Sequence, residues 1–354
     1  MRKLKVRERQ AMKKVRLGKT GLMIARLGWG GIPIQRVEER EAVSVIREVV
    51  EMGVDLLDTA RAYTNSELRI GLALKEINRP VVLSSKSPER SAKIYDDVLL
   101  SLKELNVKKI DIYHFHNVST AVDYEKIMAP EGAYEGLARA RAEGLIDYVG
   151  LTSHSLDMLE KVIEDDRVDV VMACFGLLEP RAADKVIPAA RDKDIGILAM
   201  KPFSGGVIEE AGPALRFVLA TEGVIPIPGS ETIERARENW RICAEGAPLS
   251  EKDKAWIEAI RKEYDRQFCR RCDYCQPCTE GVYIQFILSI KSTIKRVGAQ
   301  LREAEWMTSL AEKARDCTAC GECLRRCPYG LPIPDLIKEN LSLYDAFMAG
   351  ASTG

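Results

Sequence analysis

Short runs of apolar and β-branched residues recur along the chain at intervals of about 25 to 35 residues, and a segment of helical periodicity follows each run. The eight runs occupy residues 25–31, 54–59, 80–86, 109–116, 146–153, 168–175, 195–202 and 224–230. Each run is nearly continuous in apolar residues, which is typical of strands buried on both faces of a parallel sheet. The pattern therefore predicts eight strand-then-helix units.

The segments between the runs place apolar residues on one face of a helix. In the first segment the positions i, i+3, i+4, i+7 and i+8 are Ala42, Val45, Ile46, Val49 and Val50. Buried strands that alternate with amphipathic helices indicate an α/β fold with a parallel sheet, and eight repeats predict closure into a (β/α)8 TIM barrel.

An open, doubly wound sheet is the alternative architecture. That fold usually carries G-x-G-x-x-G after its first strand, whereas the first run here ends in GWGGIP. Before the first unit, residues 15–24 (VRLGKTGLMI) predict a hairpin across the barrel floor. Its GKT is not a phosphate loop, because Lys13 stands where that loop requires glycine.

Composition and charge narrow the class of protein. The chain has 354 residues, of which 46% are hydrophobic and 30% charged, and its 53 basic residues balance 53 acidic ones. A net charge of zero predicts no nucleic-acid partner, and the absence of a long apolar run predicts no membrane span. The basic first 19 residues lack the apolar core of a signal peptide. Ten cysteines without a secretory signal indicate metal or redox ligands and a cytoplasmic location, while the oligomeric state stays open.

Four acid-base side chains follow three successive predicted strands. Asp58, Lys86 and His116 each end a run, and Tyr63 follows Asp58 by five residues. A barrel of this kind places its active site at the carboxyl ends of the strands. One such residue alone is usually just solvated, but four together predict a catalytic site.

Five segments carry a resemblance to a known family. They are LLDTARAYTNSE (56–67), SSK (84–86), DIYHFH (111–116), GLTSHS (150–155) and IPGSETIERARENW (227–240). In their order and spacing the chain resembles the aldo-keto reductase family over about residues 15–245. The resemblance implies hydride transfer from NADPH to a small aldehyde or ketone. It also implies a catalytic tetrad of Asp58, Tyr63, Lys86 and His116.

The chemistry of such a tetrad can be stated independently. A free phenol has a pKa of about 10, and a neighbouring lysine cation favours its ionised form and brings the pKa toward the working range. We expect Asp58 to pair with Lys86, His116 to orient the carbonyl oxygen, and Tyr63 to donate the proton. His114 lies deeper on the same strand and is predicted to be a core or pocket-floor residue.

The cofactor positions match the family less completely. Thr152 and Ser153 stand where the resemblance implies a Ser-Asn pair that holds the nicotinamide, and Met172 stands at a usual glutamine position. Gly229 replaces a lysine, and the rest of that motif is kept by Ser230, Arg235 and Asn239. Since Arg235 supplies a cation near the start of a helix, we expect NADP(H), with NAD(H) as the alternative.

Two sets of four cysteines lie beyond the barrel. The first is Cys269, Cys272, Cys275 and Cys278, and the second is Cys317, Cys320, Cys323 and Cys327. The second set, C-x2-C-x2-C-x3-C-P, is the bacterial ferredoxin pattern for a 4Fe-4S cluster. Zinc is the alternative metal. Two C-x2-C pairs would supply its four ligands, so the third nearby cysteine in each set would have no role in a zinc site. The lone Cys174 and Cys243 are predicted to be buried.

The cysteine region predicts a second domain. We divide the chain into a barrel at residues 1–248 and a C-terminal domain at 249–354. The latter opens with a helix over 249–268 capped by Ser250 and has further helices over 281–315. It resembles a mostly α-helical ferredoxin-like domain with two 4Fe-4S clusters, in which the fourth cysteine of each set binds the cluster of the other. The first set departs from the usual pattern by having Pro277 and only two residues before its fourth cysteine.

Three functions are compatible with this organisation. In the first, a carbonyl reductase uses its clusters to exchange electrons with a redox partner such as a ferredoxin. In the second, the clusters are structural or redox-sensing, and in the third the chain is a non-catalytic sensor. The complete tetrad argues against the third. Because nicotinamide transfers two electrons as hydride and a 4Fe-4S cluster takes one, a bound flavin also stays open.

Overall fold

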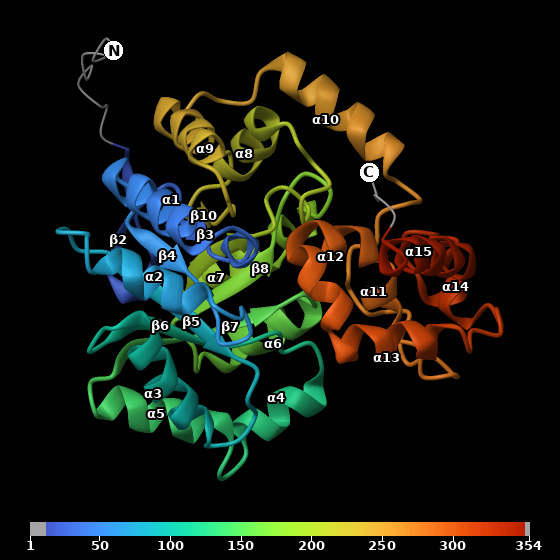
Figure 1. Ribbon diagram of the computed structural model, residues 1–354, viewed down its shortest axis with the longest axis horizontal. Helices are drawn as coiled ribbons and strands as arrows, with labels where there is room; N and C mark the ends of the chain where they lie inside the picture. The colour runs from blue at the N-terminus through green and yellow to red at the C-terminus, as the bar shows by residue number, and fades with distance from the viewer. Residues whose placement is uncertain (1–11, 351–354) are drawn as a thin grey trace.

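The computed structural model describes residues 12–350 and contains one large parallel sheet. Its eight strands follow chain order, so that β3 pairs with β4 and each later strand joins the edge of the one before it (Figure 1). The strands are β3 (Trp29–Gly30), β4 (Leu56–Asp58), β5 (Val82–Ser87), β6 (Ile110–Phe115), β7 (Ile146–Ser153), β8 (Val170–Cys174), β9 (Gly196–Met200) and β10 (Val224–Pro226). Seven of the eight predicted runs contain one of these strands, and β5 extends one residue beyond the remaining run, at 80–86.

The sheet closes on itself between its first and last strands. The amide of Gly28 donates to the carbonyl of Pro226 at 2.9 Å, and the amide of Gly30 donates to that of Pro228 at 3.0 Å. A parallel bridge also joins Gly30 to Gly229. The predicted (β/α)8 barrel is therefore confirmed, and the open-sheet alternative is wrong.

Helices cover the outside of the barrel between successive strands. They are α1 (Glu39–Glu51), α2 (Ser66–Leu74), α3 (Ile94–Leu105), α4 (Ala121–Met128), α5 (Ala133–Ala142), α6 (Leu156–Asp165), α7 (Val186–Asp192), α8 (Ala211–Leu219) and α9 (Ile233–Glu245). Short 3-10 helices η2 (Pro33–Arg36) and η3 (Pro180–Ala183) follow β3 and β8. The strand-to-helix loops therefore lie together at the carboxyl end of the sheet.

Two apolar layers hold the barrel together. One lies inside the sheet and includes Leu56, Ile112 and Met172, together with Leu17 and Ile24 from the N-terminal hairpin. That hairpin pairs β1 (Lys14–Arg16) with β2 (Met23–Ala25) around the 3-10 helix η1 (Gly18–Thr20), as predicted. The other layer lies between the strands and the surrounding helices. Met172 belongs to this inner layer and is in register with Thr152 of β7.

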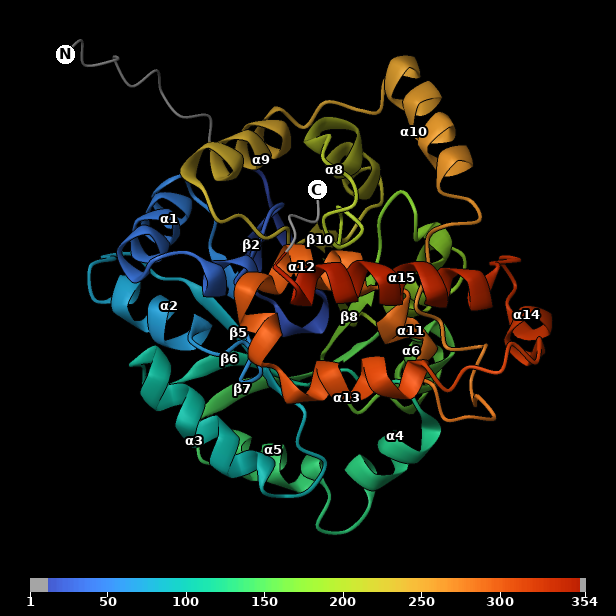
Figure 2. The same ribbon diagram turned by 45° about the vertical axis from the view of Figure 1, so that its right-hand side comes forward.

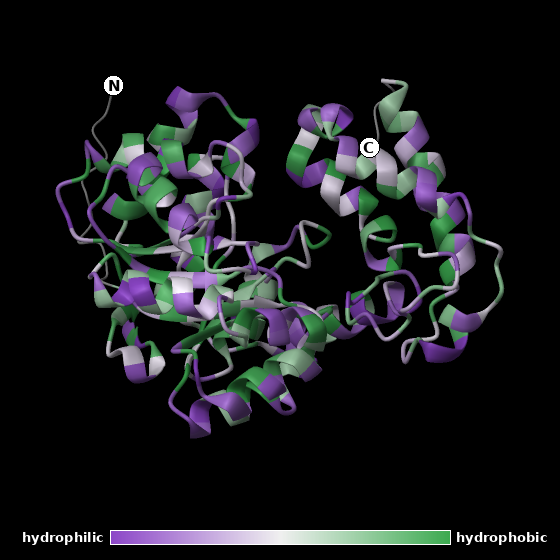
Figure 3. Ribbon diagram, turned by 90° about the horizontal axis from the view of Figure 1, so that it is seen from below, coloured by the Kyte–Doolittle hydropathy of each residue, from purple (hydrophilic) through white to green (hydrophobic). Residues whose placement is uncertain are grey.

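The C-terminal region is helical, as predicted. Its elements are α10 (Glu251–Glu263), α11 (Ile284–Ile287), α12 (Ile290–Val297), η4 (Gly298–Glu303), α13 (Glu305–Ala314), α14 (Glu322–Arg326) and α15 (Ile333–Met348). Ser250 caps α10 in a capping box with Asp253, although the helix ends at Glu263, before the predicted residue 268. Apolar and polar positions alternate along these helices (Figure 3).

The C-terminal helices have their own apolar cluster, except for α10. Residues of α11, α12, α13 and α15 pack together around the cysteine loops. By contrast, Ile257 of α10 packs with Ala214 of α8 and with Leu177 and Leu178, which follow β8. The connecting helix α10 therefore lies along the barrel, and the cysteine-bearing part beyond it is a separate packing unit.

This cysteine-bearing unit lies over the carboxyl end of the barrel. In Figure 2 the helices α12, α13 and α15 pass in front of the barrel strands. Ser292 donates to the carbonyl of Gly205 at 2.7 Å, and Gln300 donates to that of Gln35 at 3.3 Å. Because Gly205 follows β9 and Gln35 follows β3, the unit contacts the strand-end loops on either side of β10.

A membrane-spanning segment is not found in residues 12–350, where no helix is both long enough and apolar enough to cross a bilayer.

Candidate functional site

A buried ion pair lies at the ends of β4 and β5. Lys86 donates to the Oδ2 atom of Asp58 at 2.6 Å and to the carbonyl of Thr59 at 2.6 Å. Lys86 is 1% exposed and Asp58 is 3% exposed. Ser84 donates to the second carboxylate oxygen of Asp58 at 2.8 Å. Since these hydrogen bonds hold both charged groups, the ammonium group has a fixed position at the barrel mouth.

Tyr63 and His116 lie beside this pair. The ammonium of Lys86 is 5.0 Å from the centre of the Tyr63 ring, and the rings of Tyr63 and His116 meet edge-on at 5.8 Å between centroids. Tyr63 is in the loop after β4, and His116 directly follows β6. All four residues of the predicted tetrad therefore come together at the carboxyl end of the sheet.

The pKa of Tyr63 shifts in the opposite direction to the one expected from the charge of Lys86 alone. Burial raises the pKa of the Tyr63 phenol, and the positive charge of Lys86 lowers it by less, so the net direction is upward. Burial lowers the pKa of Lys86, but Asp58 and Tyr63 more than offset this and raise it above the ordinary value. The site therefore holds a neutral phenol beside a lysine cation, which is the protonation state that a proton donor needs.

The two histidines of β6 and its loop are held in the neutral form. Burial, followed by the charge of Lys86, lowers the pKa of both His114 and His116 well below the usual value. His114 is fully buried, as predicted, and its Nε2 atom lies 3.0 Å from the Ser84 hydroxyl. Ser84 therefore links His114 to Asp58. This link was not predicted, because a serine in the middle of a strand carries no distinctive sequence signal.

Thr152 and Ser153 lie at the end of β7, which pairs with β6, the strand that His116 follows. Both are buried, at 2% and 0% exposure. The Thr152 hydroxyl accepts the amide of Asn117 at 2.8 Å, and the Ser153 hydroxyl accepts the amide of Ser155 at 3.0 Å. Their side chains thus stabilise the strand-end loops. Each hydroxyl keeps a proton that it can donate to a ligand.

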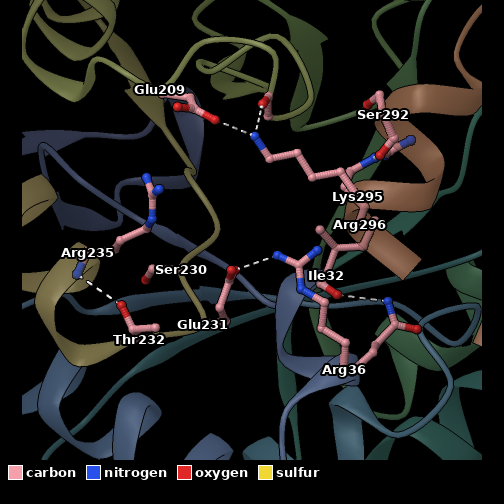
Figure 4. A network of polar contacts seen from close by, with 12 residues as sticks. Ile32, Arg36, Glu209, Ser230, Glu231, Thr232, Arg235, Ser292, Lys295 and Arg296 are labelled. Carbon is pink, nitrogen blue, oxygen red and sulfur yellow. Dashed lines mark hydrogen bonds and ion pairs between the residues drawn. The ribbon is translucent and has the colours of Figure 1, made fainter. Parts of the chain in front are cut away.

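The remaining predicted cofactor residues lie in the loop after β10 and in α9. Trp29 donates to the Ser230 hydroxyl at 3.0 Å, and Asn239 is buried within α9. At Gly229 a Cβ atom would meet the ring of Pro33, so this glycine permits close packing where β10 meets η2. Arg235 is exposed in the first turn of α9, which Thr232 caps (Figure 4).

These residues provide groups that suit a nicotinamide nucleotide. A cation beside a helix N-terminus favours a phosphate group, because the helix amides and the guanidinium both attract negative charge. In the loop after β9, the fully buried Ser204 hydroxyl finds no hydrogen-bond partner among the described residues. The donor set at the mouth therefore fits an anionic, hydrogen-bonding cofactor.

The cysteines form two groups that cross between the two sets. Cys278 of the first set lines one cavity together with Cys317, Cys320 and Cys323 of the second. Cys275 of the first set also lines this cavity, so five thiols surround it. Thiols from two distant segments around one cavity suit a 4Fe-4S cluster, whose irons require four thiolates.

The other group contains the first three cysteines of the first set. Burial, followed by the neighbouring charges of Cys269, Asp273 and Cys272, raises the pKa of Cys275. Cys327 of the second set is close enough to raise the pKa of Cys272, after burial. The two cysteine sets therefore lie close together, and the crossed pairing of their fourth cysteines stays a prediction. Cys174 and Cys243 are buried, also as predicted.

Two cations at the mouth were not predicted. Lys201 directly follows β9, and Arg296 belongs to α12 of the cysteine-bearing unit. The charge of Arg296 lowers the pKa of Tyr63, against the larger effect of burial, so Arg296 lies close to the tetrad. Nothing in the sequence separates Arg296 from the other basic residues of α12, since only folding places that helix over the barrel.

Comparisons with known proteins identify both parts of the chain. The profile of the aldo/keto reductase family matches residues 21–213, and that of the 4Fe-4S dicluster domain matches residues 268–332. L-galactose dehydrogenase of Arabidopsis thaliana is 28% identical over 221 residues, which cover 56% of this chain and 67% of the relative. The NADH-specific methylglyoxal reductase of Escherichia coli (strain K12) is 26% identical over 228 residues, covering 56% and 69%.

Solved structures show the same fold for the barrel. The holo form of an aldo-keto reductase from Bacillus halodurans superimposes with a TM-score of 0.60 at 22% identity. The match covers 70% of this chain and 96% of that structure, so the C-terminal domain is additional to the shared barrel. Taken with the two profile matches, this shows that the chain belongs to the aldo/keto reductase family and carries a 4Fe-4S dicluster domain at its C-terminus.

Proposed function

We propose that this protein is an NAD(P)H-dependent oxidoreductase that reduces a small aldehyde or ketone, with Tyr63 as the proton donor. The observation that carries the proposal is the placement of a neutral phenol beside the buried Lys86–Asp58 pair at the strand ends. The proposed catalytic residues are Asp58, Tyr63, Lys86 and His116. One relative, the NADH-specific methylglyoxal reductase of Escherichia coli, supports a carbonyl substrate.

Each member of the set has a distinct task. The bound nicotinamide supplies the hydride, and the protein must stabilise the negative charge that develops on the carbonyl oxygen. Tyr63 gives its proton to that oxygen, and the positive charge of Lys86 stabilises the phenolate that remains. Asp58 keeps Lys86 charged and in position. The neutral His116 can donate a ring N–H to the same oxygen and so orient the carbonyl carbon.

We propose NADP(H) as the nucleotide, with NAD(H) as the alternative. The exposed guanidinium of Arg235 in the first turn of α9 supports a contact with the additional phosphate of NADP(H). The NADH-specific relative supports the alternative. The proposed cofactor-binding residues are Thr152, Ser153, Gly229, Ser230, Arg235 and Asn239.

We further propose that the eight cysteines hold two 4Fe-4S clusters that exchange electrons with a redox partner such as a ferredoxin. The exposed thiol of Cys320 supports this role, since it brings one ligand set to the surface. A structural or sensing role is the alternative, supported by the buried 2.6 Å ion pair that ties Arg271, next to Cys272, to Glu179 of the barrel. In either role we propose a cytoplasmic location, as the cysteine usage indicates.

The replacement of Tyr63 by phenylalanine tests the reductase proposal. Tyr63→Phe removes only the proton donor, so we expect turnover of an aldehyde to fall by about a hundredfold or more while the fold is kept. Steady-state kinetics with NADPH and with NADH measure the effect, and circular dichroism checks the fold. Tyr283→Phe, at an exposed tyrosine of the C-terminal domain, is the matched control. Turnover by Tyr63→Phe at the wild-type rate would contradict the assignment.

A further inference from the structure

Three cationic side chains meet where the cysteine-bearing unit covers the barrel. Lys201 comes from the barrel, Arg271 from the first cysteine loop and Arg296 from α12. The nearby carboxylate of Glu179 is already used, because it pairs with Arg271 at 2.6 Å and both groups are 5% exposed. Within residues 12–350, neither Lys201 nor Arg296 forms an ion pair. Among the described side chains alone, positive charge therefore exceeds negative charge at this point.

Lys201 has a constrained position at the end of β9. Its backbone adopts a left-handed conformation with φ of 58°, which is uncommon for residues other than glycine. Its ammonium lies 2.8 Å from the Nε2 atom of His154, in the loop after β7. Burial, and then the charge of Arg271, lowers the pKa of Lys201 to about 7. The charge of Lys201 in turn reaches His116, whose pKa it helps to lower after burial and Lys86.

Arg296 is held over the mouth by its helix. Its neighbour Lys295 donates to the carbonyl of Gly206 at 2.9 Å and pairs with Glu209 at 2.8 Å (Figure 4). The hydrogen bonds of the Arg296 guanidinium stay within α12, to the carbonyl of Ser292 at 3.1 Å and the hydroxyl of Thr293 at 3.4 Å. One face of the guanidinium is therefore left for a group outside the helix.

Lys201 and Arg296 are partly buried, and a partly buried cation without an ion-pair partner is unfavourable, so an anion bound between them lowers that cost. Because Lys201 reaches His116 and Arg296 reaches Tyr63, such an anion would lie beside the groups that act on the carbonyl. We propose that Lys201 and Arg296 form an anion subsite shared by the two domains, which binds the carboxylate of an oxo-acid substrate. This inference rests on the proposed reductase function and adds its substrate class.

A pair of aldehydes of equal chain length tests the subsite. Succinic semialdehyde carries a carboxylate at its far end, and butanal does not. For Arg296→Met we expect kcat/KM for succinic semialdehyde to fall by about tenfold to a hundredfold, the scale of one charged hydrogen bond. We expect kcat/KM for butanal to change by less than about threefold, since that substrate has no group for Arg296 to bind. Arg296→Lys should keep part of the preference, because it keeps the charge.

Lys291→Met is the matched control. Lys291 is an exposed cation on the same helix and has no ion pair in the described part of the chain. Its replacement removes one positive charge from the exposed surface of α12. Both kcat/KM values should therefore stay at the wild-type level. Iron content and circular dichroism should be equal in all variants, which checks that the clusters and the fold are intact.

Three outcomes would overturn the inference. An equal loss on both aldehydes would make Arg296 a structural or general catalytic residue. Weaker NADPH binding in a fluorescence titration, with the preference between aldehydes unchanged, would assign the cations to the diphosphate of the cofactor. An equal loss of kcat/KM with Lys291→Met would show that the effect arises from the net charge of the protein alone. If the wild-type protein reduces neither aldehyde, the proposed function fails, but calorimetry with succinate still decides the subsite: the wild type should bind it, and Arg296→Met should bind it at least about tenfold more weakly.

Discussion

Individual residues handle buried charge in two different ways at the barrel mouth. Lys86 is neutralised by Asp58 at 2.6 Å, so removing either partner would leave an unpaired buried charge and cost about 3 to 5 kcal/mol of stability. Lys201 has a neutral histidine as its neighbour, and its pKa is lowered to about 7. Asp58 therefore keeps Lys86 in its charged form, whereas Lys201 has no carboxylate partner and can pair with a bound anion.

His114 predicts a pH dependence of stability. Its pKa is lowered in the folded protein by burial and then by Lys86, while in the unfolded chain it is about 6.5. Below about pH 6.5 the unfolded state binds a proton that the folded state does not, so stability falls as the pH decreases. For one such group the slope is at most about 1.4 kcal/mol per pH unit.

The variant His114→Gln should therefore lose stability less steeply than the wild type between about pH 6.5 and pH 5. Urea unfolding followed by circular dichroism at several pH values measures both slopes. His116 and His154 stay in both proteins and cancel in the comparison. Parallel curves for the two proteins would show that His114 titrates no differently in the folded state.

At the scale of elements, helix spacing around the barrel depends on individual glycines. Gly71 lies within α2, where a Cβ atom would collide with the backbone of Glu104 and Leu105 at the end of α3. Backbone atoms cannot move aside as a flexible side chain can. Gly71 therefore allows α2 and α3 to approach closely, and this keeps the loops after β4 and β5, including Tyr63, in position.

Gly71→Ala should destabilise the protein by about 1 to 3 kcal/mol, although alanine favours a helix by about 1 kcal/mol over glycine. The collision outweighs the helix propensity, because the neighbouring helix must shift. Gly212→Ala in α8 is the control, since its Cβ would meet only the end of the Arg216 side chain. Denaturant unfolding measures both variants, and equal stabilisation of the two would refute the packing argument.

At the scale of the whole molecule, the two parts depend on each other. The barrel has its own apolar layers, and the cysteine-bearing unit has a small core arranged around the thiols. Crossed ligation would join Cys278 to the second cysteine set through an inorganic core rather than through side-chain packing. The division at residue 248 is our proposal, with α10 as the connection along the barrel.

Removal of iron should unfold the cysteine-bearing unit and leave the barrel folded. Anaerobically purified protein should contain about eight iron and eight sulfide per chain. After chelation, hydrogen exchange should increase over residues 268–348 while the barrel strands stay protected, because a small core without its metal has little stability. Four irons, zinc in their place, or an unchanged C-terminal region would each contradict this prediction.

The same anaerobic protein distinguishes the two cluster roles. With electron transfer, NADPH and an added ferredoxin should change the visible absorption of the clusters, and with purely structural clusters they should not. A flavin assay on the same sample decides how a two-electron hydride could supply one-electron carriers.

The sequence by itself determined the eight units, the parallel order of the sheet and the identity of the cysteine sets. These follow from local periodicity, chain order and spacing, which can be read from the sequence of one segment at a time. It also indicated the tetrad, because each member stands at or just beyond the end of a recognisable strand. Ser84 stayed unnoticed, since its role depends on two partners, Asp58 and His114, from neighbouring strands.

Only the tertiary structure decided what covers the mouth. A helix over residues 290–297 is predictable, but its contact with Gly205 joins residues 87 apart and follows from how two apolar cores pack. The same holds for the balance of burial and charge at Tyr63, where burial outweighs Lys86. Burial and charge depend on distance in space rather than in sequence, which is why Arg296 looks ordinary in the chain although its charge acts on Tyr63, the proposed proton donor, in the fold.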